Sequence, residues 1–292
     1  MAKEGSILKR RIRWTKNGLD WEGDPRHAQE VTKALNLEEA NPVSTPMTTD
    51  KDEKDNNGAE GEDTLLTMEE ATKFRAIAAR LNYMALDRSD IAVAVVRVCS
   101  RMANPALDDW TKLKRIGGYL LHRPRVIWEY RWQPPGQRVE AYSDSDWAGD
   151  KITRRSTSGG AIYHGRHLLK TWAKEQAVIA MSSAEAELYA ACRCASEALG
   201  IQTFMRDLGN NTDVRLHMDS SSALSLTGRQ GLGKAKHIAI QHRWIQEAVA
   251  MRRLSCAKVH GDNNPADLLT KHLGAERAAY LMSLLGCYFL GA

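Results

Sequence analysis

The sequence predicts an α/β fold, with a mixed five-stranded sheet flanked by helices and a small helical subdomain before it. Residues 67–121 contain three consecutive helical patterns joined by short loops. From residue 126 to 273, short β-branched or aromatic segments give way to alternating helical and strand-like segments. The 292 residues, 43% hydrophobic and 26% charged, are enough to bury a core and have an ordinary globular composition.

The composition argues against a secreted or membrane-bound protein. The richest apolar run, residues 91–96, is far shorter than the roughly 18 residues of a membrane span and ends at Arg97. Residues 1–10 lack the apolar core of a secretory signal. We therefore expect an intracellular protein of the cytoplasm or nucleus, with no membrane partner. The five cysteines contain no Cys-x-x-Cys pair, and we expect reduced thiols.

The N-terminal part predicts a hairpin over residues 11–21, a helix over 27–37 and then a flexible acidic linker. Residues 50–63 hold seven acidic residues and two lysines, a local charge of −5, and few residues that could build a core. Because the whole chain carries +5, the remaining residues carry +10. A basic body of this kind favours a polyanionic partner, most simply nucleic acid, although a solubilising surface is the simpler alternative.

Three helices follow the linker. Thr67 and Glu70 form a capping-box pattern that opens a helix ending near Met84. Ser89 is expected to cap a second helix, which ends near residue 102. The third spans about 108–121 and is expected to be loosened by two glycines at 117 and 118.

The remaining chain predicts the sheet. Consecutive antiparallel strands are expected at 126–132, 138–143, 160–164 and 168–172. A long helix from Ser182 to about Leu208 precedes a strand at 214–219 and a short helix. Further elements are expected as a helix over 235–252, a strand over 254–259 and a helix over 265–273.

Three of the predicted elements place aspartates at their ends. Asp144 and Asp146 end a strand and point to the same face, which is also compatible with a solvated loop or with the metal-binding Asp-x-Asp of a glycosyltransferase. Asp219 ends another strand, where its simplest role is to cap the next helix. Asp267 falls in a first helical turn, where an acid complements the helix dipole.

Glu187 is harder to explain by local structure. It lies on the long helix between Ala184 and Ala191, within an apolar stripe. A carboxylate there loses hydration unless a cation, a metal or several donors compensate. Glu185 has a simpler explanation, because it can complete a capping box with Ser182.

Together, Asp144, Glu187, Asp219 and Asp267 suggest a metal site. Convergent carboxylates without a histidine or cysteine set suit hard, oxygen-seeking ions, above all Mg²⁺, with Mn²⁺ able to substitute. Two such ions can clamp the attacking and leaving oxygens of a phosphodiester.

Several motifs, in order, resemble the ribonuclease H domain of copia-type retrotransposon Pol polyproteins. They are YSDSDWAG (142–149), RRSTSGG (154–160), SSAEAELY (182–189), HMDS (217–220), KHI (236–238) and NPADLLTK (264–271). The upstream motifs RLNY (80–83), RSDI (88–91) and WTKLKRI (110–116) resemble the connection region of those polyproteins, and PVSTP (42–46) resembles the end of their reverse transcriptase.

The resemblance implies five segments: a reverse transcriptase remnant (1–41), an acidic flexible linker (42–64), a helical connection region (65–136), a ribonuclease H-like domain (137–274) and a C-terminal helix and tail (275–292). It implies two-metal endonucleolytic hydrolysis of the RNA strand of an RNA–DNA hybrid. Asp144, Glu187, Asp219 and Asp267 would be both the catalytic residues and the metal ligands, with Asp146 as an accessory candidate. A polymerase domain of a reverse transcriptase is an implied partner.

The sequence departs from the family pattern in two ways. Relatives carry a mobile histidine about ten residues before the last acid; here Ala257 holds that place, with His260 and Asp262 nearby. No Tyr-x-Asp-Asp polymerase motif occurs, so the chain cannot synthesise DNA alone. The alternative function is therefore an inactive fragment that only binds nucleic acid or a polymerase partner.

Basic residues are candidates for contacts with the phosphates of a hybrid, the alternative being a solvated surface. These candidates are Arg154, Arg155, Lys170, Lys174, Lys234, Lys236 and His237. The segment 228–235 nearly matches a phosphate-binding P-loop, but Ala235 replaces the required Ser or Thr and a helix rather than a strand precedes it. We expect no nucleotide cofactor.

Overall fold

A computed structural model describes residues 3–48, 64–229 and 243–290, which form two compact units. The first unit contains the described residues up to Glu129, His272–Ser283 and those from Cys287 onward. The second unit contains Tyr130–Lys271 and Leu284–Gly286. The division into remnant, linker, connection region, ribonuclease H-like domain and tail stays a prediction.

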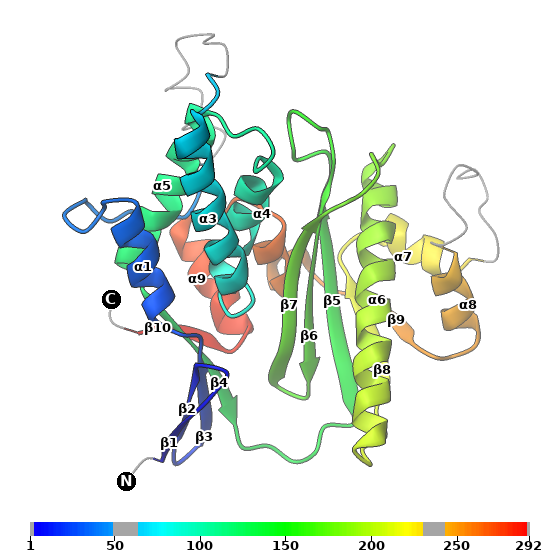
Figure 1. Cartoon of the computed structure of the whole chain (residues 1–292). Coiled ribbons are helices and arrows are strands. Elements are labelled where there is room, and N and C mark those ends of the chain that lie inside the picture. Colours follow the sequence, from blue (N-terminus) through cyan, green and yellow to red (C-terminus); the bar gives the residue numbers. More distant parts are fainter. Residues whose placement is uncertain (1–2, 49–63, 230–242, 291–292) are drawn as a thin grey trace. The chain divides into compact units, whose positions relative to one another are not determined.

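The first unit combines a five-stranded sheet with a group of helices (Figure 1). The sheet order is β1 (Glu4–Ile7), β2 (Arg10–Trp14), β3 (Gly18–Glu22), β4 (Arg125–Arg131) and β10 (Cys287–Leu290). The helices are α1 (Arg26–Ala34), α3 (Met68–Met84), the 3₁₀ turn η1 (Ser89–Ile91), α4 (Ala92–Ser100), α5 (Leu107–His122) and α9 (Ala275–Leu284). The buried faces of α1, α3, α4 and α5 meet around Phe74, Leu81 and Leu113, each fully buried.

Some local predictions for the first unit hold and others do not. Thr67 and Glu70 form the predicted capping box at the start of α3. Ser89 does not cap a helix; it begins η1, which has no side-chain cap. Gly117 does not loosen α5 but makes room for its neighbours, because a Cβ there would lie 2.6 Å from Leu37 Cδ1 and 2.7 Å from Leu35 Cδ1.

The prediction of four consecutive antiparallel strands is wrong for the first of them. β4 pairs antiparallel with β10, with Trp128 opposite Cys287. β10 lies in the segment predicted as a helix and tail. Since β4 finds its partner near the other end of the chain, the sheet of the second unit begins with β5.

The second unit contains the predicted mixed five-stranded sheet flanked by helices (Figure 1). The strand order is β7 (His167–Glu175), β6 (Thr157–His164), β5 (Arg138–Asp146), β8 (Asp213–Met218) and β9 (Ser255–Lys258). β5, β6 and β7 are antiparallel, whereas β8 is parallel to both β5 and β9. The helices are α6 (Ser183–Asp207), α7 (Ser221–Thr227) and α8 (Trp244–Ala250), with the 3₁₀ segments η3 (Gly261–Asn263) and η4 (Pro265–Leu269).

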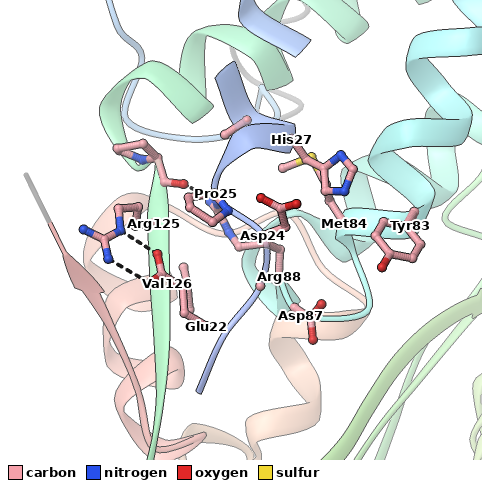
Figure 2. A pocket seen from close by; sticks show the side chains of 13 residues that line it. Glu22, Asp24, Pro25, His27, Tyr83, Met84, Asp87, Arg88, Arg125 and Val126 are labelled. Atoms are coloured by element: carbon pink, nitrogen blue, oxygen red, sulfur yellow. Dashed lines mark hydrogen bonds and ion pairs between the residues drawn. The ribbon is translucent and has the colours of Figure 1, made fainter. Parts of the chain in front are cut away.

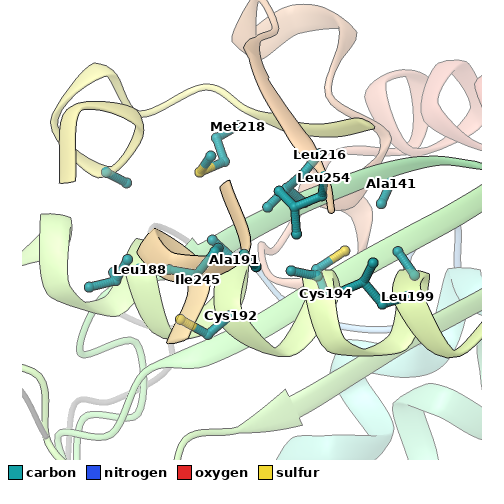
Figure 3. Close-up of a cluster of buried hydrophobic side chains, with 14 of the residues drawn as sticks. Ala141, Leu188, Ala191, Cys192, Cys194, Leu199, Leu216, Met218, Ile245 and Leu254 are labelled. Atoms are coloured by element: carbon teal, nitrogen blue, oxygen red, sulfur yellow. The ribbon is translucent and has the colours of Figure 1, made fainter. Parts of the chain in front are cut away.

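The core of the second unit lies between the sheet and α6 (Figure 3). Ala141, Leu216 and Met218 come from the central strands, and Leu188, Ala191 and Cys194 from α6. α6 begins at the predicted N-cap Ser182, and residues 185–192 are all buried. This part of the helix is therefore enclosed on all sides rather than along a single stripe, and Glu187 is inside it.

Two glycines of β6 allow close packing on the two faces of the strand. A Cβ at Gly159 would lie 2.7 Å from Leu269 Cβ and 2.8 Å from Thr270 Cγ2, so η4 approaches the strand closely. A Cβ at Gly160 would lie 2.7 Å from the Trp172 ring. Gly159 is the cross-strand neighbour of Asp144, so its missing side chain brings η4 beside that carboxylate.

Two expectations concern the chain as a whole. Among the described residues, no helix combines the length and apolar character needed to cross a membrane. All five cysteines are free thiols, as predicted.

Candidate metal centre

Three of the four predicted acids meet at one edge of the sheet in the second unit. Asp144 lies near the carboxyl end of β5, and Asp219 directly follows the parallel neighbour β8. Parallel strands end at the same edge, so the pairing of β5 with β8 brings these two carboxylates together. Glu187 of α6 completes the group, in which one carboxylate oxygen from each residue lies within 4.8 Å of the others.

The carboxylate of Glu187 is buried and only one of its oxygens has a hydrogen-bond partner among the described residues. Its Oε1 accepts a hydrogen bond from the Ser145 backbone N–H at 3.3 Å. Its Oε2 is buried and has no hydrogen-bond partner among the described residues. Burial, followed by the charges of Asp144 and Asp219, raises the pKa of Glu187 to about 8. The sequence predicts that burying the charge of Glu187 costs free energy, and the raised pKa of Glu187 in the fold agrees with this prediction.

Asp144 is almost completely buried, with 1% exposure. The Thr270 hydroxyl donates to its Oδ2, and Lys271 Nζ donates to its Oδ1 at 3.3 Å. Burial raises the pKa of Asp144 to about 7; Lys271 opposes that rise, whereas Asp267 adds to it. One nearby ammonium thus only partly compensates the buried carboxylate.

Asp267 lies on η4, beside this group. Its Oδ1 accepts from Lys271 Nζ at 2.7 Å, so a single ammonium links Asp267 to Asp144. Asn264 fixes η4 in place: its Nδ2 donates to the Ser143 carbonyl at 3.0 Å, and its Oδ1 accepts from the Ala266 N–H at 3.2 Å.

Thr270 and Lys271 are not among the predicted site residues, although both belong to the NPADLLTK motif. They lie three and four residues after Asp267, a spacing that returns a side chain to the same side of a helical turn. That spacing was the available signal for their position near the acid.

The other acids do not join the group. Asp146 is not among its ligands. Glu185 does not close a capping box through the Ser182 N–H: its Oε2 accepts from the Met181 N–H at 2.9 Å, and its Oε1 accepts from the Tyr189 hydroxyl. Asp219 does not cap the next helix either, because Ser220 is the N-cap of α7.

Among the described residues, no histidine belongs to the carboxylate group. Ala257 lies on β9, opposite His217, whose Nε2 is 2.7 Å from Glu140 Oε2. His260 is largely exposed, with its ring 3.4 Å from Asp262.

The predicted nucleic-acid residues have different surroundings. Arg155 pairs with Glu175 at 3.1 Å and Lys170 with Glu197 at 2.6 Å, so nearby acids partly neutralise both. Arg154 and Lys174 are exposed. Lys234, Lys236 and His237 lie outside the described residues. The assignment of these residues to phosphate contacts stays a prediction.

The described part of the first unit has a pocket of its own, lined by several charged side chains (Figure 2). Its charged side chains are compensated: Arg125 binds Glu22 at 2.7 Å, and Arg88 binds Asp90 at 2.7 Å. The Arg26 guanidinium lowers the pKa of Asp24 to about 2. Because these charges neutralise one another, the carboxylate group of the second unit remains the candidate site.

The donor set of that group fits a hard divalent cation. It consists of carboxylate oxygens, the ligands that Mg²⁺ prefers. The buried Glu187 Oε2 lacks a partner, and the acids raise one another's pKa, as expected where positive charge is missing.

No family model matches the chain. The chain is 27% identical over 281 residues to the retrovirus-related Pol polyprotein from transposon TNT 1-94 of Nicotiana tabacum, a match that covers 92% of this chain and 20% of that protein. It is 30% identical over 253 residues to the retrovirus-related Pol polyprotein from transposon RE2 of Arabidopsis thaliana, covering 85% of this chain and 17% of that protein. Over most of its length, this chain is therefore similar to retrovirus-related Pol polyproteins from plant transposons. It spans about a fifth of the length of these Pol polyproteins.

A solved structure of LC11-RNase H1, isolated from compost, is 17% identical to this Pol-related chain. The match covers 46% of this chain and 93% of that one, with a TM-score of 0.34. The fold of the second unit is established independently by its strand order and pairing.

Proposed function

We propose that the second unit is a metal-dependent ribonuclease H that cleaves the RNA strand of RNA–DNA hybrids internally. The observation that supports this most strongly is the meeting of Asp144, Glu187 and Asp219 within 4.8 Å, from elements far apart in the sequence. The similarity of the chain to retrovirus-related Pol polyproteins also supports a nuclease as the function of such a site.

In this proposal the four acids hold divalent ions, with Mg²⁺ favoured and Mn²⁺ able to substitute. Asp144, Glu187 and Asp219 would hold one ion, and Asp144 and Asp267 the second. Bound ions of this kind lower the pKa of an attacking water and stabilise a leaving oxygen. Asn264 would hold η4, and with it Asp267, in position through its hydrogen bond to the Ser143 carbonyl. Thr270 would orient Asp144 through the hydrogen bond from its hydroxyl.

The proposed substrate is a nucleic-acid hybrid for two reasons. The carboxylates suit the divalent ions used in phosphodiester hydrolysis, and the chain has an excess of basic residues outside its acidic segment. Selection of the RNA strand would depend on groove shape and 2′-hydroxyl contacts rather than on base identity. A polymerase domain, such as those implied for the longer Pol polyproteins, is a proposed partner.

The test is cleavage of an end-labelled RNA–DNA hybrid by the full chain, with Mg²⁺ or with EDTA. We expect internal cuts in the RNA strand only with Mg²⁺, and none from Asp144→Asn. Hybrid binding without cleavage by the unmutated chain would instead support the inactive binding fragment. The glycosyltransferase alternative would use Asp146, which is not part of the carboxylate group, so the group favours the nuclease.

A further inference from the structure

The Lys271 ammonium lies between two of the four predicted acids, Asp144 and Asp267. Its Nζ lies 2.7 Å from Asp267 Oδ1 and 3.3 Å from Asp144 Oδ1. The ammonium therefore binds one oxygen of each of the two acids assigned to the second ion. Both ion pairs are charge-assisted hydrogen bonds, of which the shorter has ordinary geometry.

A divalent ion would need the same oxygens. Mg²⁺ binds carboxylate oxygens at about 2.1 Å. An oxygen that donates its electron pair to such an ion is less able to accept a hydrogen bond from an ammonium, and the two cations repel each other. Lys271 and an ion shared by Asp144 and Asp267 are therefore competitors for one position.

The side chain of Lys271 is able to leave. It is 38% exposed, whereas that of Asp144 is 1% exposed. A lysine ammonium on its flexible stem is well hydrated once it returns to water. The fixed acids and the movable lysine make the exchange of an ammonium for a metal ion physically simple.

We propose that Lys271 is an internal counter-ion, which fills the position between Asp144 and Asp267 in the metal-free protein and is displaced when a divalent ion binds there. This inference rests on the proposed metal site. It predicts two unequal ions: one held by Asp144, Glu187 and Asp219 without competition, and a weaker one whose binding must displace Lys271. The charge of the site would thus be partly neutralised whether or not the second ion is present.

The test is the substitution Lys271→Met in the full chain, with Mg²⁺ binding measured by isothermal titration calorimetry. Methionine keeps an unbranched side chain but removes the charge. We expect the weaker Mg²⁺ affinity to rise by roughly threefold to tenfold, as for removal of a partly exposed ion pair, and the stronger affinity to change less. The melting temperature in EDTA should fall by about 2–4 °C, because two acids lose their cation.

Lys114→Met is the matched control. Lys114 is an exposed lysine of α5 in the first unit, so this variant has the same change in net charge without altering the second unit. Its Mg²⁺ affinities should stay within about twofold of the unmutated protein, since the charge of an exposed side chain is largely screened by salt.

The possible outcomes separate the inference from the proposed function. Unchanged Mg²⁺ affinity in Lys271→Met would overturn the competition, and reduced affinity would show that Lys271 instead orients Asp267 for the ion. In both cases the metal site itself would stand. If the unmutated chain binds no Mg²⁺, or if Asp144→Asn binds it equally well, the metal site and the counter-ion fall together.

Discussion

Substitution of Gly159 by alanine should damage the candidate site without changing any of its acids. The added Cβ would lie 2.7 Å from Leu269 Cβ, 2.8 Å from Thr270 Cγ2 and 3.0 Å from the Leu269 carbonyl oxygen. Ordinary contacts of this kind are near 3.5–4.0 Å. Since one of these atoms is backbone and another is a Cβ, rotation of a side chain cannot relieve the contact, and η4 must move by about 1 Å.

The expected cost follows from that displacement. Overpacking of a close contact typically destabilises a protein by about 1–3 kcal/mol. The same movement would draw Asp267, Thr270 and Lys271 away from Asp144. A misplacement of about 1 Å can reduce a catalysed rate by about a hundredfold, so cleavage should fall more than stability alone explains.

The assay combines thermal unfolding in EDTA with cleavage of a labelled hybrid under Mg²⁺, both on the full chain. Gly200→Ala is the control: Gly200 lies within α6, and a Cβ there would meet nothing within 4 Å. This change should leave cleavage intact and stabilise the helix by about 0.5–1 kcal/mol. If Gly159→Ala melts and cleaves like the unmutated protein, the close approach of η4 to β6 is refuted.

Three further predictions concern charge. Glu187→Gln should reduce Mg²⁺-dependent cleavage by about a hundredfold or more, whereas Glu185→Gln should retain most of it because a glutamine oxygen can still accept from the Met181 N–H; the reverse ranking would disprove the residue assignment. The metal-free protein should lose stability as the pH rises from about 4 to 8, because the folded pKa values of Asp144 and Glu187, about 7 and 8, exceed their unfolded values and the folded state therefore holds more protons in this window. Melting curves in EDTA across this range check the sign, and saturating Mg²⁺ should flatten the dependence. Finally, hybrid binding in EDTA should weaken steeply with added salt; a flat response would remove the argument from the basic excess.

The sheet of the second unit could be predicted because its signals are local. Alternation and turn residues identify β5 to β9, and parallel pairing of β5 with β8 then places Asp144 beside Asp219. Glu187 could be singled out because an acid among apolar helix positions needs a compensating partner. These inferences depend only on the order of elements and the direction of side chains along each one.

The features that escaped prediction depend on contacts between distant residues. The pattern of β4 fits either sheet, and its pairing with β10 is decided by residues about 160 positions later in the chain. Glu185 accepts from the Met181 N–H instead of completing a capping box with Ser182, a choice that the capping-box pattern alone does not reveal. The link that Lys271 makes between Asp144 and Asp267 requires η4 to lie against Gly159, a closeness that no periodicity encodes.

The pairing of β4 with β10 has a consequence for folding during synthesis on the ribosome. The first unit is interrupted in sequence by the second, so its sheet gains its last strand only after all the carboxylates of the second unit have been synthesised. Until then the edge of β4 that will receive β10 offers unpaired backbone groups to any other strand. A nascent chain that stalls or is truncated just after Lys271 would contain every candidate metal ligand. Its β4 edge would still be unpaired and able to form β-pairs with other chains. Loss of residues 272–292 should therefore cause aggregation during synthesis.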